Sequence, residues 1–153
     1  MNEVRVQTAD FDVGAEIAAL SAGHGATGAV ASFVGLVRHD GEVAAMTLEH
    51  YPGMTERALA EIVGEAKARW SLIAVRVIHR VGRLLPGERI VFVGIASTHR
   101  HDAFSACAFV MDYLKTRAPF WKKEDTPSGP RWVDARETDD FAAARWQEGK
   151  TPP

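Results

Sequence analysis

The segment RIVFVGIASTHRHDAFSACAFVMDYLKTRA, residues 89–118, is the most informative part of this 153-residue chain for predicting its fold. Its first part, Arg89 to Ser97, is rich in β-branched residues and predicts a buried strand. Its second part, Arg100 to Ala118, has apolar residues at helical spacing and predicts a long helix that ends at Pro119. The predicted apolar stripe of this helix consists of Phe104, Cys107, Ala108, Met111 and Leu114. A buried strand followed by a long amphipathic helix indicates a sheet with helices packed on it.

The same alternation of strands and helices continues on both sides of this stretch. Alternating or β-branched segments predict further strands at residues 4–6, 29–38, 43–51, 73–81, 120–124 and 131–133. Apolar residues at helical spacing predict further helices after Asp12, at 54–70 and at 138–146. We expect segments 29–38 and 43–51 to pair as a hairpin, Gly35 to mark a bulge, and 82–88 to form a turn. The order predicts an α+β fold with a mostly antiparallel or mixed sheet and packed helices.

Composition limits the class of protein. The chain has 18 Lys+Arg against 20 Asp+Glu, a net charge of −2, which argues against strong non-specific binding of nucleic acid. Its 46% of hydrophobic residues suffices for one core, so we expect a single domain over residues 1–153, with a flexible tail at about 148–153. No apolar run approaches the roughly 20 residues that cross a membrane. Without a signal peptide pattern, the expected location is the cytoplasm.

The one cysteine of the chain is Cys107. A single cysteine excludes an internal disulfide and a cysteine-rich zinc site. Its position on the apolar side of the predicted helix favours a structural role over that of a nucleophile. His99 and His101 have no further ligand clustered with them in the sequence, so we expect no metal site.

The first candidate site is the junction Ser97-Thr98-His99-Arg100-His101. Free backbone N–H groups and the positive end of the helix dipole meet where a helix begins, and both favour an anion. Arg100 adds a planar guanidinium that suits phosphate, and His99 adds a donor whose charge changes near pH 7. The alternative is that Thr98 caps the helix and the rest is a solvated first turn.

The second candidate site involves Lys115. This lysine continues a row that advances by four residues along the apolar side of the predicted helix, through Ala103, Cys107 and Met111. A lysine in a partly apolar site loses its proton more easily and can act as a base or nucleophile. The alternative is a lysine that complements the helix dipole in the last turn and reaches water.

Two further lysines, Lys122 and Lys123, follow Phe120 and Trp121 in a predicted strand. Side chains alternate along a strand, so one of the two lysines points toward whichever face carries a pocket. The alternative is an edge strand protected by charge. Positively charged side chains thus occur at or near the ends of several predicted strands and helices. They are Arg38, His99, Arg100, Lys115 and Lys122, and Arg38 ends the predicted strand 29–38. Such a set in a net-acidic protein suits a compact anion or a carboxylate better than a long polyanion.

Several blocks of the sequence resemble the large, catalytic subunits of molybdopterin synthase. The blocks are FVGLVR (33–38), LEHYPGMTE (48–56), HRVGRLLPGE (79–88), HR (99–100), MDYLKTRAPFWKKE (111–124) and RWVDARE (131–137). They occur in the right order and cover nearly the whole chain, from about Val30 to Trp146. The resemblance implies an α+β fold of the α/β-hammerhead type and an enzyme that transfers sulfur.

The resemblance also implies partners and a reaction. It implies a homodimer in which each large subunit binds one small ubiquitin-like sulfur-carrier subunit, giving a heterotetramer. The carrier's C-terminal Gly-Gly, activated as a thiocarboxylate, reaches into a pocket of the large subunit. Two sulfurs then pass to cyclic pyranopterin monophosphate, which becomes molybdopterin, the dithiolene ligand of the molybdenum cofactor. The resemblance implies no cofactor or metal on this subunit, and the partner's sulfur makes a cysteine nucleophile unnecessary.

By this resemblance, roles fall on matching residues of this chain. Lys115 and Lys122 are implied as catalytic lysines that also contact the substrate, close to the carrier's terminal carbonyl. The other residues implied in substrate binding are Leu36, Val37, Arg38, His99, Arg100, Lys123, Glu124 and Arg136. Phe33 and Met111 are implied as apolar neighbours of the carrier tail.

Two other functions are weighed against this one. The first is a non-catalytic module that docks a partner's tail against Phe120-Trp121. The second is a phosphate-ester lyase or hydrolase that acts without a partner, for which the sequence offers no obvious acid–base pair.

Overall fold

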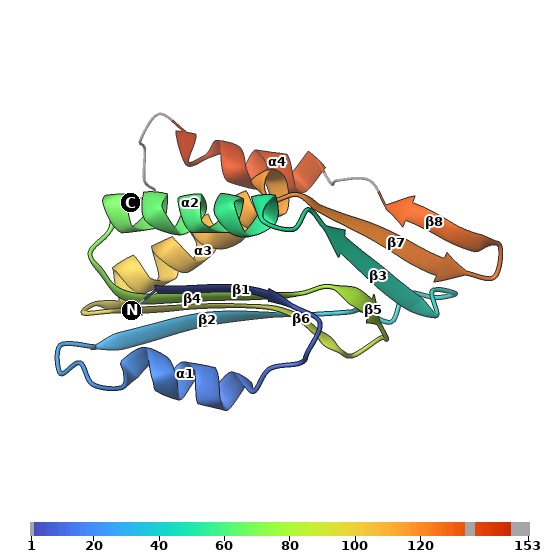
Figure 1. The fold of residues 1–153 in the computed structure, drawn as a ribbon. Helices are drawn as coiled ribbons and strands as arrows, with labels where there is room; N and C mark the ends of the chain where they lie inside the picture. The colour runs from blue at the N-terminus through green and yellow to red at the C-terminus, as the bar shows by residue number, and fades with distance from the viewer. Residues whose placement is uncertain (1, 134–136, 148–153) are drawn as a thin grey trace.

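The computed structural model describes residues 2–133 and 137–147 of the chain (Figure 1). Its elements, in chain order, are β1 (Asn2–Gln7), α1 (Val13–Ser21), β2 (Ala29–Leu36), β3 (Ala45–His50), α2 (Met54–Arg69), β4 (Leu72–Arg80), β5 (Gly82–Leu84), β6 (Arg89–Ser97), α3 (Arg100–Arg117), β7 (Phe120–Thr126), β8 (Gly129–Val133) and α4 (Glu137–Ala144). The predicted α+β class is confirmed. Arg136 and the predicted tail at 148–153 lie outside the described residues.

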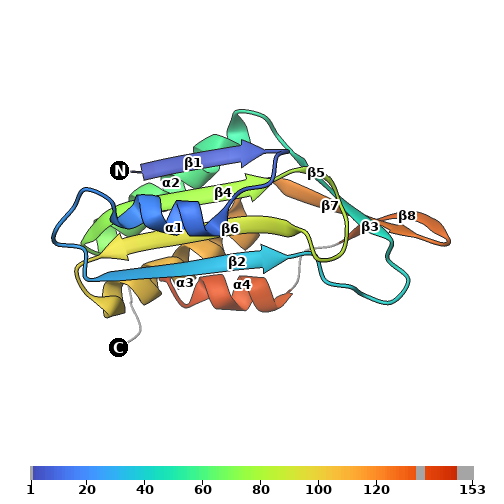
Figure 2. The same cartoon turned by 90° about the horizontal axis from the view of Figure 1, so that it is seen from below.

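The first sheet has the strand order β1-β4-β6-β2 (Figure 2). β1 pairs with β4 in parallel, whereas β6 pairs with β4 and with β2 in antiparallel fashion, so the sheet is mixed. The central strands β4 and β6 are buried along most of their length, and β6 is almost continuously apolar, which is typical of strands covered on both faces. α1 covers one face of this sheet, and α2 and α3 cover the other (Figure 1).

The second sheet has the order β5-β3-β7-β8 and is antiparallel throughout. The predicted hairpin between segments 29–38 and 43–51 is wrong, because β2 pairs with β6 and β3 pairs with β5 and β7. The chain crosses between sheets after β2: Val37 N–H donates to the Glu88 carbonyl and Ala44 N–H donates to the Asp125 carbonyl, both at 2.9 Å. β5 occupies part of the predicted turn.

The bulge predicted at Gly35 is confirmed and directs this crossing. The register of β2 against β6 shifts between Gly35 and Leu36. A Cβ at Gly35 would lie 2.7 Å from Val91 Cγ1, so a larger residue would clash with β6. Beyond the shift, the chain carries Arg38 toward the second sheet, where it lines a cavity together with Glu124 of β7.

The buried side of α3 differs from the predicted stripe. The helix buries Ala103, Ala106, Cys107, Phe109, Val110, Tyr113 and Leu114. Phe104 is 66% exposed, which corrects its assignment to the core. The reason is that α3 packs against helices as well as the sheet, and Phe109 meets Trp70 after α2 and Trp146 after α4 at centroid distances of 5.4 and 5.5 Å. A second side of α3 carries residues that follow one another at intervals of three or four. They are Arg100, Phe104, Ala108, Met111 and Lys115.

Candidate functional site

The two predicted catalytic lysines lie near the same buried imidazole. Lys115 is in the last turn of α3, and Lys122 is in β7. The positive charges of both lysines lower the pKa of His79, as does His50 at the end of β3. Both lysines are therefore close enough to His79 to act on its charge, where the C-terminal end of α3 meets the second sheet; the Lys115 side chain is exposed, and that of Lys122 is partly buried.

His79 is the centre of this group, which we call the lysine–histidine cluster (His50, His79, Lys115 and Lys122). The His79 side chain is held in β4 and is only 3% exposed. Its ring stacks on Phe120, with centroids 3.7 Å apart and planes at 17°. Burial is the main cause that lowers the pKa of His79 to about 3, and the nearby positive charges add to it. The imidazole is therefore neutral at physiological pH.

His79 was not among the residues predicted for the site. It lies in the block HRVGRLLPGE, to whose residues the resemblance assigns no role. One feature of the sequence could have indicated it: His79 continues the alternating row of Val75 and Val77, on the face of β4 that α2 and α3 cover. A polar residue at the end of such an apolar row is a candidate for a buried functional group.

A cavity of about 130 Å³, the inner cavity, opens between the end of β2 and the second sheet. Four predicted site residues line it, namely Leu36, Val37, Arg38 and Glu124. Its other lining residues are Asp40, Val43, Met46, Ile90 and Val133. Glu124 and Lys122 are two residues apart on β7, so they share one face of the strand. The inner cavity and the lysine–histidine cluster thus lie along the same face of the second sheet.

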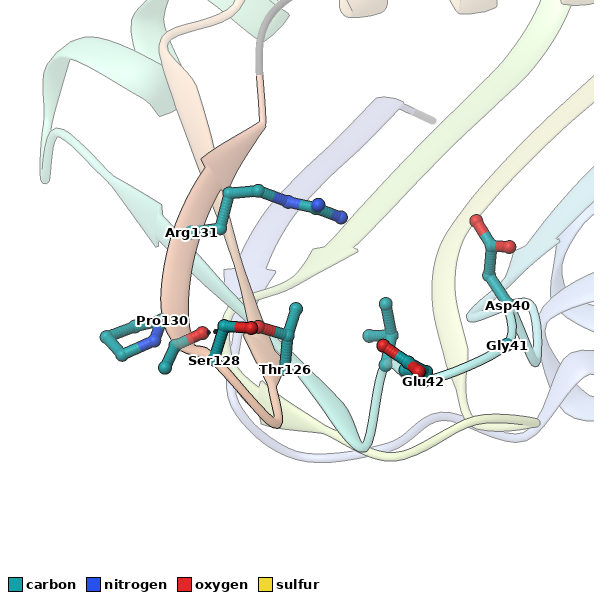
Figure 3. A pocket seen from close by; sticks show the side chains of 9 residues that line it. Asp40, Gly41, Glu42, Thr126, Ser128, Pro130 and Arg131 are labelled. Carbon is teal, nitrogen blue, oxygen red and sulfur yellow. Dashed lines mark hydrogen bonds between the residues drawn. The ribbon is translucent and has the colours of Figure 1, made fainter.

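A larger cavity of about 360 Å³, the tip cavity, lies between the 40–43 loop and the turn that joins β7 to β8 (Figure 3). The side chain of Arg131 extends from β8 into this space, toward the side that carries Asp40 (Figure 3). Arg131 also pairs with Glu124 at 3.0 Å. Asp40 and Val43 line both cavities, so the two adjoin. The sequence pattern did not predict this hollow: it indicated a strand that begins at Val43, whereas β3 begins at Ala45.

Lys123 lies on the other face of β7. Its Nζ stands 5.4 Å from the centroid of the Trp132 ring, and Trp121 on the same face is 48% exposed. Lys122 lies on the opposite face of β7, the face from which Glu124 lines the inner cavity, but Lys122 itself is not among the residues that line this cavity. The structure does not bring Lys123 together with the inner cavity.

Phe33 and Met111 lie on the side of the first sheet that α2 and α3 cover. Phe33 of β2 pairs with Val93, which belongs to the core beneath α3, and its side chain is 40% exposed. Met111 is partly buried and lies one helical turn before Lys115. Both apolar side chains therefore keep some accessible surface on the side of the molecule that carries α3.

His99 and Arg100 are remote from the lysines within one chain. His99 is the N-cap of α3, Arg100 is its first residue, and both are exposed. Lys115 lies 15 residues further along the helix, which corresponds to about 22 Å. The alternative in which Thr98 caps this helix is wrong, because the N-cap is His99, whose side chain makes no capping hydrogen bond.

Cys107 is not poised as a nucleophile. The thiol is buried, with its Sγ 3.9 Å from the Val93 carbonyl oxygen, and burial raises its pKa to about 11. It is therefore protonated at neutral pH. Over residues 2–133 and 137–147, no group of three or more His, Cys, Asp or Glu side chains is arranged to hold a metal ion. In the same part of the chain, every helix is too short or too polar to cross a bilayer.

Comparisons with known proteins identify the family. The family model described as MoaE protein matches residues 6–117. The molybdopterin synthase catalytic subunit of Ralstonia nicotianae is 64% identical over 149 residues, covering 95% of this chain and 85% of the relative. The solved structure of the molybdopterin biosynthesis MoaE protein from Burkholderia ambifaria is 62% identical with a TM-score of 0.84, covering 95% of this chain and 98% of that one. The crystal structure of molybdopterin synthase from Staphylococcus aureus has 27% identity and a TM-score of 0.78, covering 84% and 95%. The chain therefore belongs to the MoaE family, and the resemblance seen in its sequence blocks is confirmed.

Proposed function

We propose that this chain is the catalytic subunit of a cytoplasmic molybdopterin synthase, acting as a homodimer that binds two small sulfur-carrier subunits. Family membership supports the reaction, and the relatives' name, catalytic subunit, implies a second kind of subunit. The observation that carries the proposal is the lysine–histidine cluster beside the inner cavity. Two lysines and Arg38 there provide positive charge for an anionic substrate and for a thiocarboxylate.

In this proposal the chain supplies charge and position, while the carrier supplies sulfur. The carrier's C-terminal thiocarboxylate reaches Lys115 and Lys122, and cyclic pyranopterin monophosphate binds at the inner cavity. Cations that are fixed before the reaction stabilise the negative charge that develops in it, and holding both reactants together lowers the entropic barrier. A lysine either polarises the carbonyl of the thiocarboxylate or acts as a free amine. In the second case the sulfur first bonds to the substrate as a thioester; the amine then attacks the thioester carbonyl, the C–S bond breaks, and the sulfur stays on the substrate as a thiol that takes the amine's proton.

The remaining predicted residues surround these groups in the proposal. Arg38 binds the substrate's anionic part, while Leu36, Val37 and Glu124 complete the wall of the inner cavity. Phe33 and Met111 contact the carrier tail, since both keep accessible apolar surface on the α3 side. Lys123 and Arg136 stay predictions from the resemblance alone.

We further propose that each site takes His99 and Arg100 from the partner subunit. One side of α3 carries Arg100, Phe104, Ala108, Met111 and Lys115, and Phe104 is largely exposed. In a twofold-symmetric dimer, a residue i that meets residue j of its partner is matched by j meeting i. Two α3 helices packed antiparallel along this side would bring Arg100 of the partner subunit to Lys115, with Ala108 near the axis. Each dimer then holds two complete sites.

The test of the proposed function is reconstitution from purified parts. The purified chain is mixed with thiocarboxylated carrier and cyclic pyranopterin monophosphate, and molybdopterin is assayed. We expect product with this carrier and none with the same carrier ending in an ordinary carboxylate. No product with a verified, correctly paired carrier would contradict the proposal. Turnover of the substrate to a sulfur-free product without any carrier would instead favour a phosphate-ester lyase or hydrolase that acts alone.

A further inference from the structure

The buried imidazole of His79 has no part in the chemistry above, although both lysines lie beside it. Its ring is fixed on two sides: Phe120 stacks on it at 3.7 Å, and the Arg80 carbonyl oxygen lies 2.8 Å from Nδ1. Phe120 is two residues before Lys122 on the same face of β7. The stack therefore joins β4 of the first sheet to the strand that carries Lys122.

The hydrogen bond to Arg80 determines the tautomer. A carbonyl oxygen only accepts, so Nδ1 of His79 carries the hydrogen and donates it. In the neutral ring, Nε2 then has a lone pair and no hydrogen. Because Nδ1 is tied back to the backbone of β4, Nε2 lies at the far end of the ring. His79 projects from the face of β4 that α2 and α3 cover, so this end of the ring is turned away from the first sheet.

Apart from the stacked Phe120, the groups on other elements whose charges act on the ring are basic. They are Lys115 from α3, Lys122 from β7 and His50 from β3. A protonated imidazole among them would add a buried positive charge next to two ammonium groups. A neutral acceptor is compatible with them, because each lysine ammonium has three hydrogens to donate.

We propose that His79 is a positioning residue for the lysine pair: its ring fixes the start of the Lys122 strand, and its Nε2 is an uncharged acceptor for a lysine ammonium. The inference rests on the proposed function for its catalytic consequence, but the placement of the lysines can be tested without it. The role is distinct from that of an inert core histidine, in which only the volume of the ring matters.

Three variants separate the parts of the imidazole. His79→Phe keeps an aromatic ring for the Phe120 stack and removes both nitrogens. His79→Gln offers an amide at the distance of Nε2, and His79→Asn offers one near Nδ1 only. If Nε2 is the group that matters, Gln replaces histidine better than Asn does.

The first readout is chemical and does not need the enzyme to turn over. Each folded variant is treated briefly with an amine-reactive acetylating reagent, and the modification of single lysines is measured by mass spectrometry. Loss of one hydrogen bond predicts about fivefold faster modification of Lys115 or Lys122 in His79→Phe. The exposed Lys67 on α2 serves as the internal control and should not change. Unchanged rates at both site lysines in His79→Phe would overturn the inference.

The second readout is sulfur transfer with thiocarboxylated carrier. We expect kcat to fall about 10- to 100-fold in His79→Phe with little change in KM, and to recover largely in His79→Gln. Equal activity of the Gln and Asn variants would overturn the role of Nε2, even if the Phe variant fails to fold. Absence of product with the wild-type chain would contradict the proposed function instead, and the lysine-modification result would still decide the role of His79.

Discussion

Arg100 and Lys115 lie on one side of α3 but at opposite ends of it, about 22 Å apart. No single site of ordinary size contains both side chains within one chain. If both serve the same reaction, they do so across a dimer, and this gives the sharpest test of the proposed assembly.

Mixing two inactive variants should restore activity. Arg100→Ala and Lys115→Ala each remove one half of every site when alone. After the subunits are exchanged, a mixed dimer has one site with both residues intact, so random mixing predicts about a quarter of the wild-type rate. The measurement is molybdopterin formation before and after exchange under mild denaturant.

The control for this experiment is the double variant Arg100→Ala/Lys115→Ala, taken through the same exchange by itself, which should stay inactive. If both residues acted within one chain, the mixture of single variants would also stay inactive. That outcome would refute the shared site.

Each lysine of the cluster should matter for the reaction and not for carrier binding. Lys115→Ala and Lys122→Ala remove a cation beside the reacting carbonyl, so we expect about 10²- to 10⁴-fold slower product formation. Affinity for the carrier, measured by calorimetry, should change little. Lys67→Ala, at an exposed position of α2, is the matched control. A Lys115→Ala variant with full activity would favour the non-catalytic docking module.

The stability of the fold should depend on pH through His79. Its pKa is about 3 in the folded chain against an ordinary value of 6.5. Between these values the unfolded chain binds a proton that the folded chain does not, so the free energy of unfolding falls as pH falls. The limiting slope is about 1.4 kcal/mol per pH unit. Urea unfolding at several pH values should give a shallower dependence for His79→Phe. Parallel curves for the two proteins would contradict a neutral, buried His79.

The C-terminal helix should be held mainly by one residue that follows it. Trp146 is 2% exposed, its indole N–H donates to Asp112 at 2.7 Å, and its carbonyl accepts from Arg69 at 2.6 Å. Trp146→Ala should therefore lower the free energy of unfolding by about 3–5 kcal/mol. Phe141→Ala, in the same helix but 76% exposed, should cost less than about 0.5 kcal/mol. Equal costs for the two variants would show that α4 is not docked in this way.

Local patterns in the sequence were sufficient for most elements. The helix predicted at 54–70 is observed at Met54–Arg69, and the helix predicted after Asp12 begins at Val13, where the Asp12 side chain caps it by accepting from the Ala15 N–H at 3.1 Å. Helix periodicity and capping depend on neighbours within a few residues, so a single sequence contains them. The pairing of β2 with β6 could not be read in this way, because strand partners distant in sequence compete with the adjacent strand.

The class of chemistry could be predicted from the amino-acid sequence, because it contains several cations at the ends of predicted elements, one cysteine without a partner, and blocks that identify the family. Which of these groups meet could be known only from the three-dimensional structure. It joined Lys115 and Lys122 at a buried, neutral His79, gave Leu36, Val37, Arg38 and Glu124 a common cavity, and left Arg100 at the far end of α3. Residue types and their spacing are properties of the linear sequence. The distance between two side chains in the folded chain depends instead on which strands pair and on the 1.5 Å rise of each helical residue.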